Sequence, residues 1–146
     1  MPRISVDPPA PFDPSKPSPI TFTVSNINIV PLHNVKIGLG ICYIRSADHP
    51  PLGSDIESDP KRCNDPPIAG LIRWQVDWLD TDEKYELNLE DLLNIKPSDH
   101  IERADITIFI MYEPWRLPKQ RTRQFRFLAR PLSDGKIYWE PMPLNL

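Results

Sequence analysis

The sequence predicts an all-β protein, an immunoglobulin-like β-sandwich of seven or eight antiparallel strands with one long loop at about 46–69. Short β-branched and aromatic stretches of strand length recur at residues 20–24, 35–39 and 106–110. Prolines flank nearly every stretch, and the chain holds 19 prolines against 5 glycines, so its turns rely on a φ fixed at about −65°. The length favours a single domain over 1–146, since a chain of about 150 residues buries roughly two thirds of its surface on folding.

The first half of the chain is expected to contribute three strands. Residues 1–18 form an extended, proline-rich segment that includes the first strand, near residues 2–7. The second strand runs over 19–28 and the third over 33–45, and because the turn between them is short, these two are expected to pair antiparallel with each other. The long loop that follows is rich in Asp, Pro and Ser, and loops of that length are usually functional or mobile.

Two segments in the second half predict most of the core. In residues 72–78, Trp74, Val76 and Trp78 alternate with polar residues, so both tryptophans are expected to face inward. Residues 103–113 form the longest and most apolar run of the chain. Such a run predicts a central strand that is buried on both faces.

The remaining strands are shorter or more polar. Alternating runs predict strands at 85–89 and 121–130, and a hairpin turn at 133–136 leads to a last strand at 137–139. The predicted core consists of the inward-facing residues of all these strands: Phe22, Val24, Ile37, Trp74, Val76, Ile108, Ile110, Phe125 and Phe127.

Charge is unevenly distributed along the chain. The net charge is only −3, too small for the global field to drive binding to nucleic acid or to an anionic membrane. The excess of basic residues falls in the segment 115–130, where aromatic side chains are interleaved with them. The candidate binding residues are Trp115, Arg116, Lys119, Arg121, Arg123 and Arg126. They suit phosphates, an anionic glycan or an acidic partner; the alternative is that they protect a sheet edge and pair with the acidic body.

No motif for catalysis or metal binding is present. The serines lack a Gly-x-Ser-x-Gly elbow and the glycines form no phosphate-binding loop, so no catalytic residue and no cofactor is assigned. The acidic residues of the 46–69 loop lack the glycine and the terminal acid of a calcium loop, and the three histidines are isolated from one another. A non-catalytic protein is expected, and a hydrolytic enzyme is the least favoured function.

Two cysteines leave one intramolecular disulfide open. Cys42 lies in a predicted strand and Cys63 in the long loop. A bridge between them would stabilise the fold by about 3 kcal/mol, given a closed loop of about 20 residues. Free thiols are the alternative, because the redox state of the compartment decides between them.

Several short motifs resemble the C-terminal, β-rich domain of uncharacterised bacterial membrane-anchored proteins. They are ADIT at 104–107, YEPW at 112–115, RTRQFRF at 121–127 and DGKIYW at 134–139. FTVSN at 22–26 with LHNV at 32–35 is similar to paired strands of immunoglobulin-like and fibronectin-like bacterial modules.

The resemblance implies a protein-interaction or spacer module on the extracytoplasmic face of a bacterial membrane. Its partner is a protein of unknown identity, nucleic acid is not expected to bind, and membrane contact comes only through an anchor upstream of this chain. Without such an anchor, a cytoplasmic protein with free thiols is expected. The alternative function is carbohydrate or anion binding by the 115–130 segment.

Overall fold

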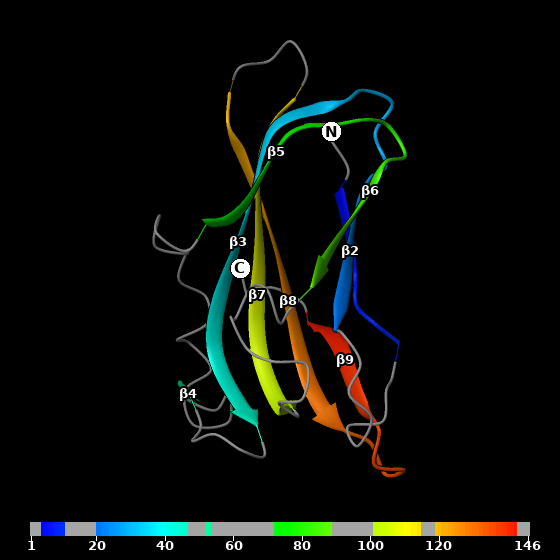
Figure 1. Ribbon diagram of the computed structural model, residues 1–146, viewed down its shortest axis with the longest axis vertical. Helices are drawn as coiled ribbons and strands as arrows, with labels where there is room; N and C mark the ends of the chain where they lie inside the picture. The colour runs from blue at the N-terminus through cyan, green and yellow to red at the C-terminus, as the bar shows by residue number, and fades with distance from the viewer. Residues whose placement is uncertain are drawn as a thin grey trace.

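The computed structural model is an all-β protein whose strands form two sheets packed against each other (Figure 1). It describes residues 4–10, 20–46, 52–53, 72–88, 101–114 and 119–142, apart from the side chains of 41–46, 52–53, 72–74 and 101–102. All strand pairs are antiparallel. Eight strands of four residues or more and one two-residue strand are present in this part of the chain. The predicted β-sandwich is confirmed.

The small sheet has the strand order β1-β2-β6. Its strands are β1 (Ile4–Asp7), β2 (Thr21–Asn26) and β6 (Lys84–Asn88). Phe22 and Val24 on β2 are fully buried, and Thr21 and Thr23, which alternate with them, are half-buried. This alternation places one face of the sheet on the core and the other in solvent.

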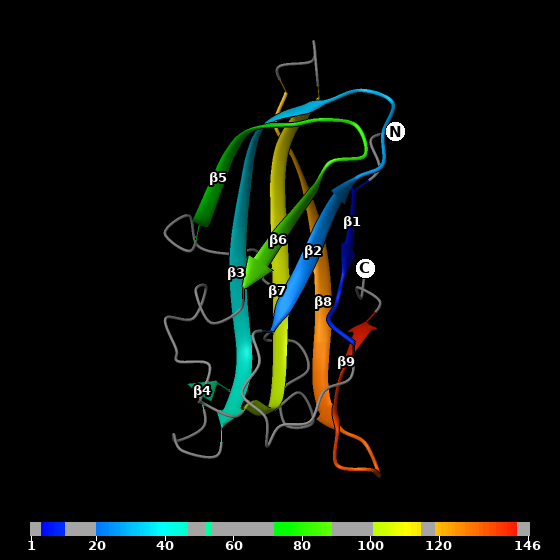
Figure 2. The ribbon, with the colours of Figure 1, turned by 45° about the vertical axis from the view of Figure 1, so that its right-hand side comes forward.

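The large sheet is built around the two longest strands. Its strands are β3 (Leu32–Ser46), β4 (Leu52–Gly53), β5 (Ile72–Leu79), β7 (Ile101–Pro114), β8 (Arg121–Pro131) and β9 (Ile137–Met142). Their order is β4-β3-β7-β8-β9. β4 and β5 pair with the same edge of β3, β5 along its first half and β4 near its end. Figure 2 shows the small sheet lying across this longer sheet.

The central strand β7 is buried on both faces, as predicted. Every residue from Ala104 to Ile110 is buried. On one face, Ile106, Ile108 and Ile110 point into the space between the sheets. On the other face, Asp105, Thr107 and Phe109 are buried as well, so neither face of this stretch is open to water.

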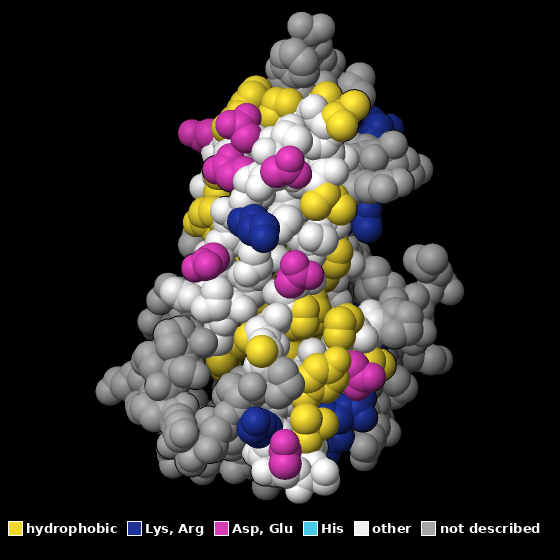
Figure 3. Space-filling view, turned by 90° about the vertical axis from the view of Figure 1, so that its right-hand side faces the viewer, with side chains coloured by type: hydrophobic (Ala, Val, Ile, Leu, Met, Phe, Trp, Pro, Cys, Tyr) yellow, Lys and Arg dark blue, Asp and Glu magenta, His cyan; other side chains and the backbone are white. Residues whose placement is uncertain are grey.

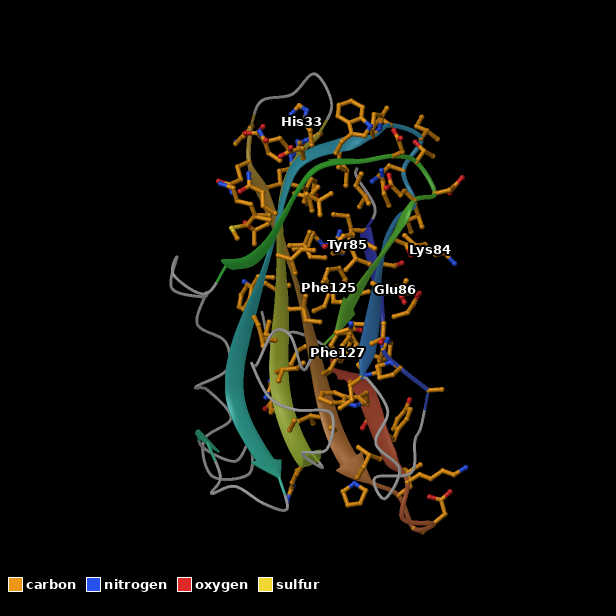
Figure 4. All side chains as sticks on the ribbon, in the orientation of Figure 1. His33, Lys84, Tyr85, Glu86, Phe125 and Phe127 are labelled. Carbon is orange, nitrogen blue, oxygen red and sulfur yellow. The ribbon has the colours of Figure 1, made fainter. Side chains whose placement is uncertain are left out.

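The core between the sheets is centred on aromatic rings. The Phe22 ring lies 5.0 Å from that of Phe127 and 5.2 Å from that of Trp139, measured between centroids. Figure 4 shows Tyr85, Phe125 and Phe127 between the sheets. Most of the predicted core is confirmed as buried: Phe22, Val24, Ile37, Ile108, Ile110 and Phe127, with Val76 and Phe125 partly buried against them. The side chain of Trp74 lies outside the described residues.

The predicted pairing of the second and third strands is wrong. β2 pairs with β1 and β6, whereas β3 belongs to the large sheet. The connection over residues 27–31 therefore crosses from one sheet to the other. A short connection can join two strands of one sheet in a hairpin, or it can join strands of two facing sheets. The sequence of the connection alone does not distinguish these two arrangements.

The predicted core position of Trp78 is also wrong. Trp78 is 43% exposed, and its neighbour Leu79 is buried instead. The cause lies in β3, where Asn34 has a φ of 49° and the pairing with β7 shifts by one residue. A shift of one residue exchanges the two faces of a strand. From Leu32 to Ile37 the pairing of β3 with β5 keeps a constant register, so the alternation of β5 changes at the same point.

No helix among the described residues has the length and apolar composition needed to span a membrane.

Candidate functional site

Two connections meet at the end of the sandwich where β3 begins and β5 ends (Figures 1 and 2). One is the β2–β3 connection over residues 27–31, and the other is the β5–β6 connection over 80–83. Leu32 and Leu79, which border them, are direct partners across β3 and β5. We call residues 27–31 together with 78–83 the loop end.

The buried side chain of Asn26 holds both connections of the loop end. Its Nδ2 donates to the carbonyl oxygen of Val30 at 3.1 Å and to that of Leu79 at 3.0 Å. Its Oδ1 accepts from the backbone N–H of Asn28 at 3.0 Å and from the Asn28 side chain at 2.8 Å. The Asp82 N–H donates to the Asn26 carbonyl at 2.8 Å. One amide thus fixes two loops that are more than fifty residues apart in sequence.

The loop end exposes large hydrophobic side chains. Ile29 is 94% exposed, Ile27 50% and Trp78 43%. Among the described residues only one further large hydrophobic side chain is exposed to this degree, Leu132 at 40%, and it lies in the β8–β9 hairpin. Exposed apolar surface opposes solubility, so such a group of residues on fixed loops is the candidate interaction surface.

Acidic side chains border this apolar surface. Asp80, Asp82 and Glu83 are exposed, and Figure 3 shows acidic side chains beside hydrophobic ones at this end of the molecule. The Trp78 Nε1–H donates to Asp80 Oδ1 at 2.6 Å, and the Asp80 N–H donates to Glu83 Oε2 at 2.7 Å. These bonds hold the indole and the carboxylates in place.

A polar pocket of about 210 Å³ lies next to the loop end, lined by Asn34, Lys36, Gln75, Glu113 and Gln120. Lys36 stands between the inward-facing Val35 and Ile37, so the pocket opens on the outer face of the large sheet. Glu113 Oε2 accepts a hydrogen bond of 2.7 Å from Asn34 Nδ2 and lies 3.2 Å from His33 Nε2.

The candidate binding residues of the 115–130 segment are divided by the structure. Lys119, Arg121 and Arg123 are exposed at or just before the start of β8, and the Arg123 guanidinium lies 5.7 Å from the centre of the Phe125 ring. Trp115 and Arg116 lie outside the described residues.

Arg126 is not part of an exposed basic surface, which corrects its assignment as a binding residue. Its Nε donates to Asp105 Oδ1 at 3.0 Å and its Nη2 to Asp105 Oδ2 at 2.7 Å. Both side chains are at most 3% exposed. The guanidinium and the carboxylate pair in a bidentate geometry, so Arg126 bonds to a neighbouring strand of the large sheet and its guanidinium is not exposed to a ligand.

The other predicted features lie outside what the structure describes. The side chain of Cys42 and all of Cys63 lie outside the described residues, so the disulfide stays a prediction. Most residues of the predicted 46–69 loop lie outside them as well. Within the described ranges, no three His, Cys, Asp or Glu side chains are grouped as metal ligands would be.

Comparison of the chain with models of known protein families, with curated proteins and with solved structures found no match.

Proposed function

We propose that this protein is a non-catalytic interaction module that docks a protein partner through the loop end. The observation that carries the proposal is the exposure of Ile27, Ile29 and Trp78 on loops that the buried Asn26 fixes in place. A surface that is ordered before binding loses little conformational entropy when the partner arrives. An exposed tryptophan is also among the residues that contribute most to protein interfaces.

The acidic border indicates the chemistry of the partner. Asp80, Asp82 and Glu83 are exposed on the connection that follows Trp78, so the complementary surface is apolar with lysines or arginines on one side. The same carboxylates oppose insertion of the loop end into an anionic bilayer. Anion binding by the 115–130 segment has less support, because Arg126 is buried in its pair with Asp105.

An immunoglobulin-like topology is part of the proposal. The orders β1-β2-β6 and β3-β7-β8 correspond to the A-B-E and C-F-G strand orders of immunoglobulin sandwiches. Loops at one end of such sandwiches commonly form the binding surface. The loop end occupies the corresponding place.

The membrane-anchored location is a separate proposal, supported by the resemblance of the sequence motifs. Ile4 pairs with Asn26, so the chain enters the fold at the loop end. An anchor close upstream would keep this end near the bilayer, where the partner would then be another membrane-bound protein.

Photo-crosslinking tests the proposed docking surface. A benzoylphenylalanine at position 29 is compared in cells with one at position 132, which replaces an exposed leucine at a distant hairpin. We expect a discrete protein adduct at position 29 only, which Asp80→Lys with Asp82→Lys reduces. Equal adducts at both positions, or none at position 29, would contradict the proposal. The proposal would also be contradicted if the purified protein bound phosphatidylglycerol vesicles more strongly than it binds the crosslinked protein.

A further inference from the structure

The polar pocket beside the loop end has a lining that suits an uncharged, hydroxyl-rich ligand. Three carboxamides, one ammonium and one carboxylate converge on it from β3, β5, β7 and the start of β8. Carboxamides both donate and accept hydrogen bonds, and the two charges offset each other. A phosphate group would need more cationic partners than Lys36, and a wholly apolar ligand would leave the mostly polar lining without hydrogen-bond partners.

Several polar groups of the pocket are available to a ligand. Within the described part of the chain, Glu113 Oε1, the Lys36 ammonium and the amides of Gln75 and Gln120 have no hydrogen-bond partner in the protein. Glu113 Oε2, in contrast, is bonded to Asn34. The carboxylate is therefore held through one oxygen, and the other is left to bond a ligand.

The backbone at the pocket is specialised. Asn34 adopts a φ of 49°, in the left-handed region that side chains other than Asn and Asp rarely enter. In this conformation its carboxamide reaches Glu113 on the neighbouring strand. Backbone conformations of this kind are often found at binding sites.

An aromatic ring completes the surface. His33 pairs with Trp78 on β5 and with Glu113 on β7, so the indole and the carboxylate share one face, two strand spacings or about 10 Å apart. The rings of His33 and Trp78 lie 6.3 Å apart between centroids, and Figure 4 places His33 at this end of the molecule. An exposed indole offers an apolar face on which the C–H groups of a sugar ring can pack.

We propose that this pocket binds a neutral saccharide, with one sugar unit held by Glu113, Lys36 and the three amides and the adjoining unit packed toward Trp78. The pocket is smaller than the roughly 300–1,000 Å³ typical of drug-sized ligands, as a site for one ring of an oligosaccharide should be. This site differs from the protein-docking surface in its polar pocket and in not using Ile27 or Ile29, although the two sites share Trp78.

Nuclear magnetic resonance titration tests the assignment. The side-chain amide signals of Asn34, Gln75 and Gln120 and the indole signal of Trp78 are followed while maltose, cellobiose, lactose or N,N′-diacetylchitobiose is added at millimolar concentration. We expect saturable shifts of these signals with at least one of the four neutral disaccharides. Glu113→Gln should weaken that binding about tenfold or more, because it removes a charged acceptor. Glu140→Gln, at a half-exposed glutamate on β9 that is paired with Arg130 away from the pocket, should leave it unchanged.

The proposal is wrong if none of the four sugars shifts the pocket amides, if Glu113→Gln binds as tightly as the wild type, or if a sulfated disaccharide is preferred to all neutral ones. Ile29→Ser separates this proposal from the proposed function: it should abolish the protein adduct and leave the sugar titration unaltered. Far-ultraviolet circular dichroism of each variant confirms that it is folded.

Discussion

Asp105 and Arg126 form a bidentate ion pair on neighbouring central strands, with both side chains almost completely shielded from water. Arg126 stands directly opposite Thr107, so the pair spans the diagonal between β7 and β8. A buried pair of this kind contributes little net stability, but removing one partner leaves an uncompensated charge in the protein interior.

Arg126→Met should therefore destabilise the fold by about 3–5 kcal/mol. The double variant Asp105→Leu with Arg126→Met should recover much of that loss, because no unpaired charge remains. Urea denaturation monitored by tryptophan fluorescence measures both. A single variant within about 1 kcal/mol of the wild type would mean that the pair is hydrated in solution.

Trp139→Ala should be among the most damaging core substitutions. The indole is fully buried against Phe22, and its removal leaves a large cavity between the sheets, for a cost of about 3–5 kcal/mol. Tyr138→Ala is the matched control, since the Tyr138 side chain, next to Trp139 in sequence, lies on the other face of β9 and is only half-buried. The free energies of unfolding should differ clearly between the two, and equal losses would refute the register of β9.

Asn26→Ala should loosen the loop end. The substitution leaves the buried carbonyl of Leu79 and the partly buried carbonyl of Val30 without their donor, at about 1–3 kcal/mol for the buried group and less for the other. The amide of Asp82, which donates to the backbone carbonyl of residue 26, should also exchange its hydrogen faster, because the side chain that ties the two connections together is gone. Asn88→Ala, which removes an exposed bond to Thr21, serves as the control. Unchanged exchange at Asp82 would argue against a fixed loop end.

Gly40→Ala should destabilise the large sheet through a steric contact. A Cβ at this position would lie 2.9 Å from Phe109 Cε2, closer than real Cβ atoms approach a neighbour. Overpacking of this kind costs about 1–3 kcal/mol. Thermal denaturation should show the loss, and adding Phe109→Leu should relieve part of it. A double variant that is simply the sum of the two single variants would exclude the contact as the cause.

The sequence predicts the strands well because period-two alternation and continuous apolar runs depend on local chemistry. The central strand was predicted from the run that contains Ile106, Ile108 and Ile110, and its burial on both faces follows from that pattern. The pairing of strands depends on distant contacts, which explains why the sheet assignment of β2 and β3 could not be predicted from the short turn between them.

Two local features escape alternation. The positive φ of Asn34 shifts the face of β3 and, through pairing, that of β5, so Trp78 faces outward. Asp105 was detectable as an acid in the interior of the longest apolar run, since an acid buried there requires a partner. Its partner on β8 was not, because alternation alone predicts an outward and exposed Arg126.

The candidate site could be predicted only in part. The sequence predicts binding residues in the basic 115–130 segment, and of these Lys119, Arg121 and Arg123 are exposed. Ile27 and Ile29 were not predicted as part of a site. They are apolar residues within a short turn, where polar residues are usual, and this composition could have indicated an exposed apolar surface. Whether such residues are buried depends on how the loop crosses between the sheets.

The most direct test of the docking surface is calorimetric titration of the purified protein with the partner identified by crosslinking at position 29. Ile29→Ser should weaken binding by about tenfold or more, as expected for loss of a buried anchor, whereas Leu132→Ser should change the dissociation constant by less than about twofold. Equal affinities of the wild type and Ile29→Ser, or equal losses for both variants, would contradict a partner site at the loop end.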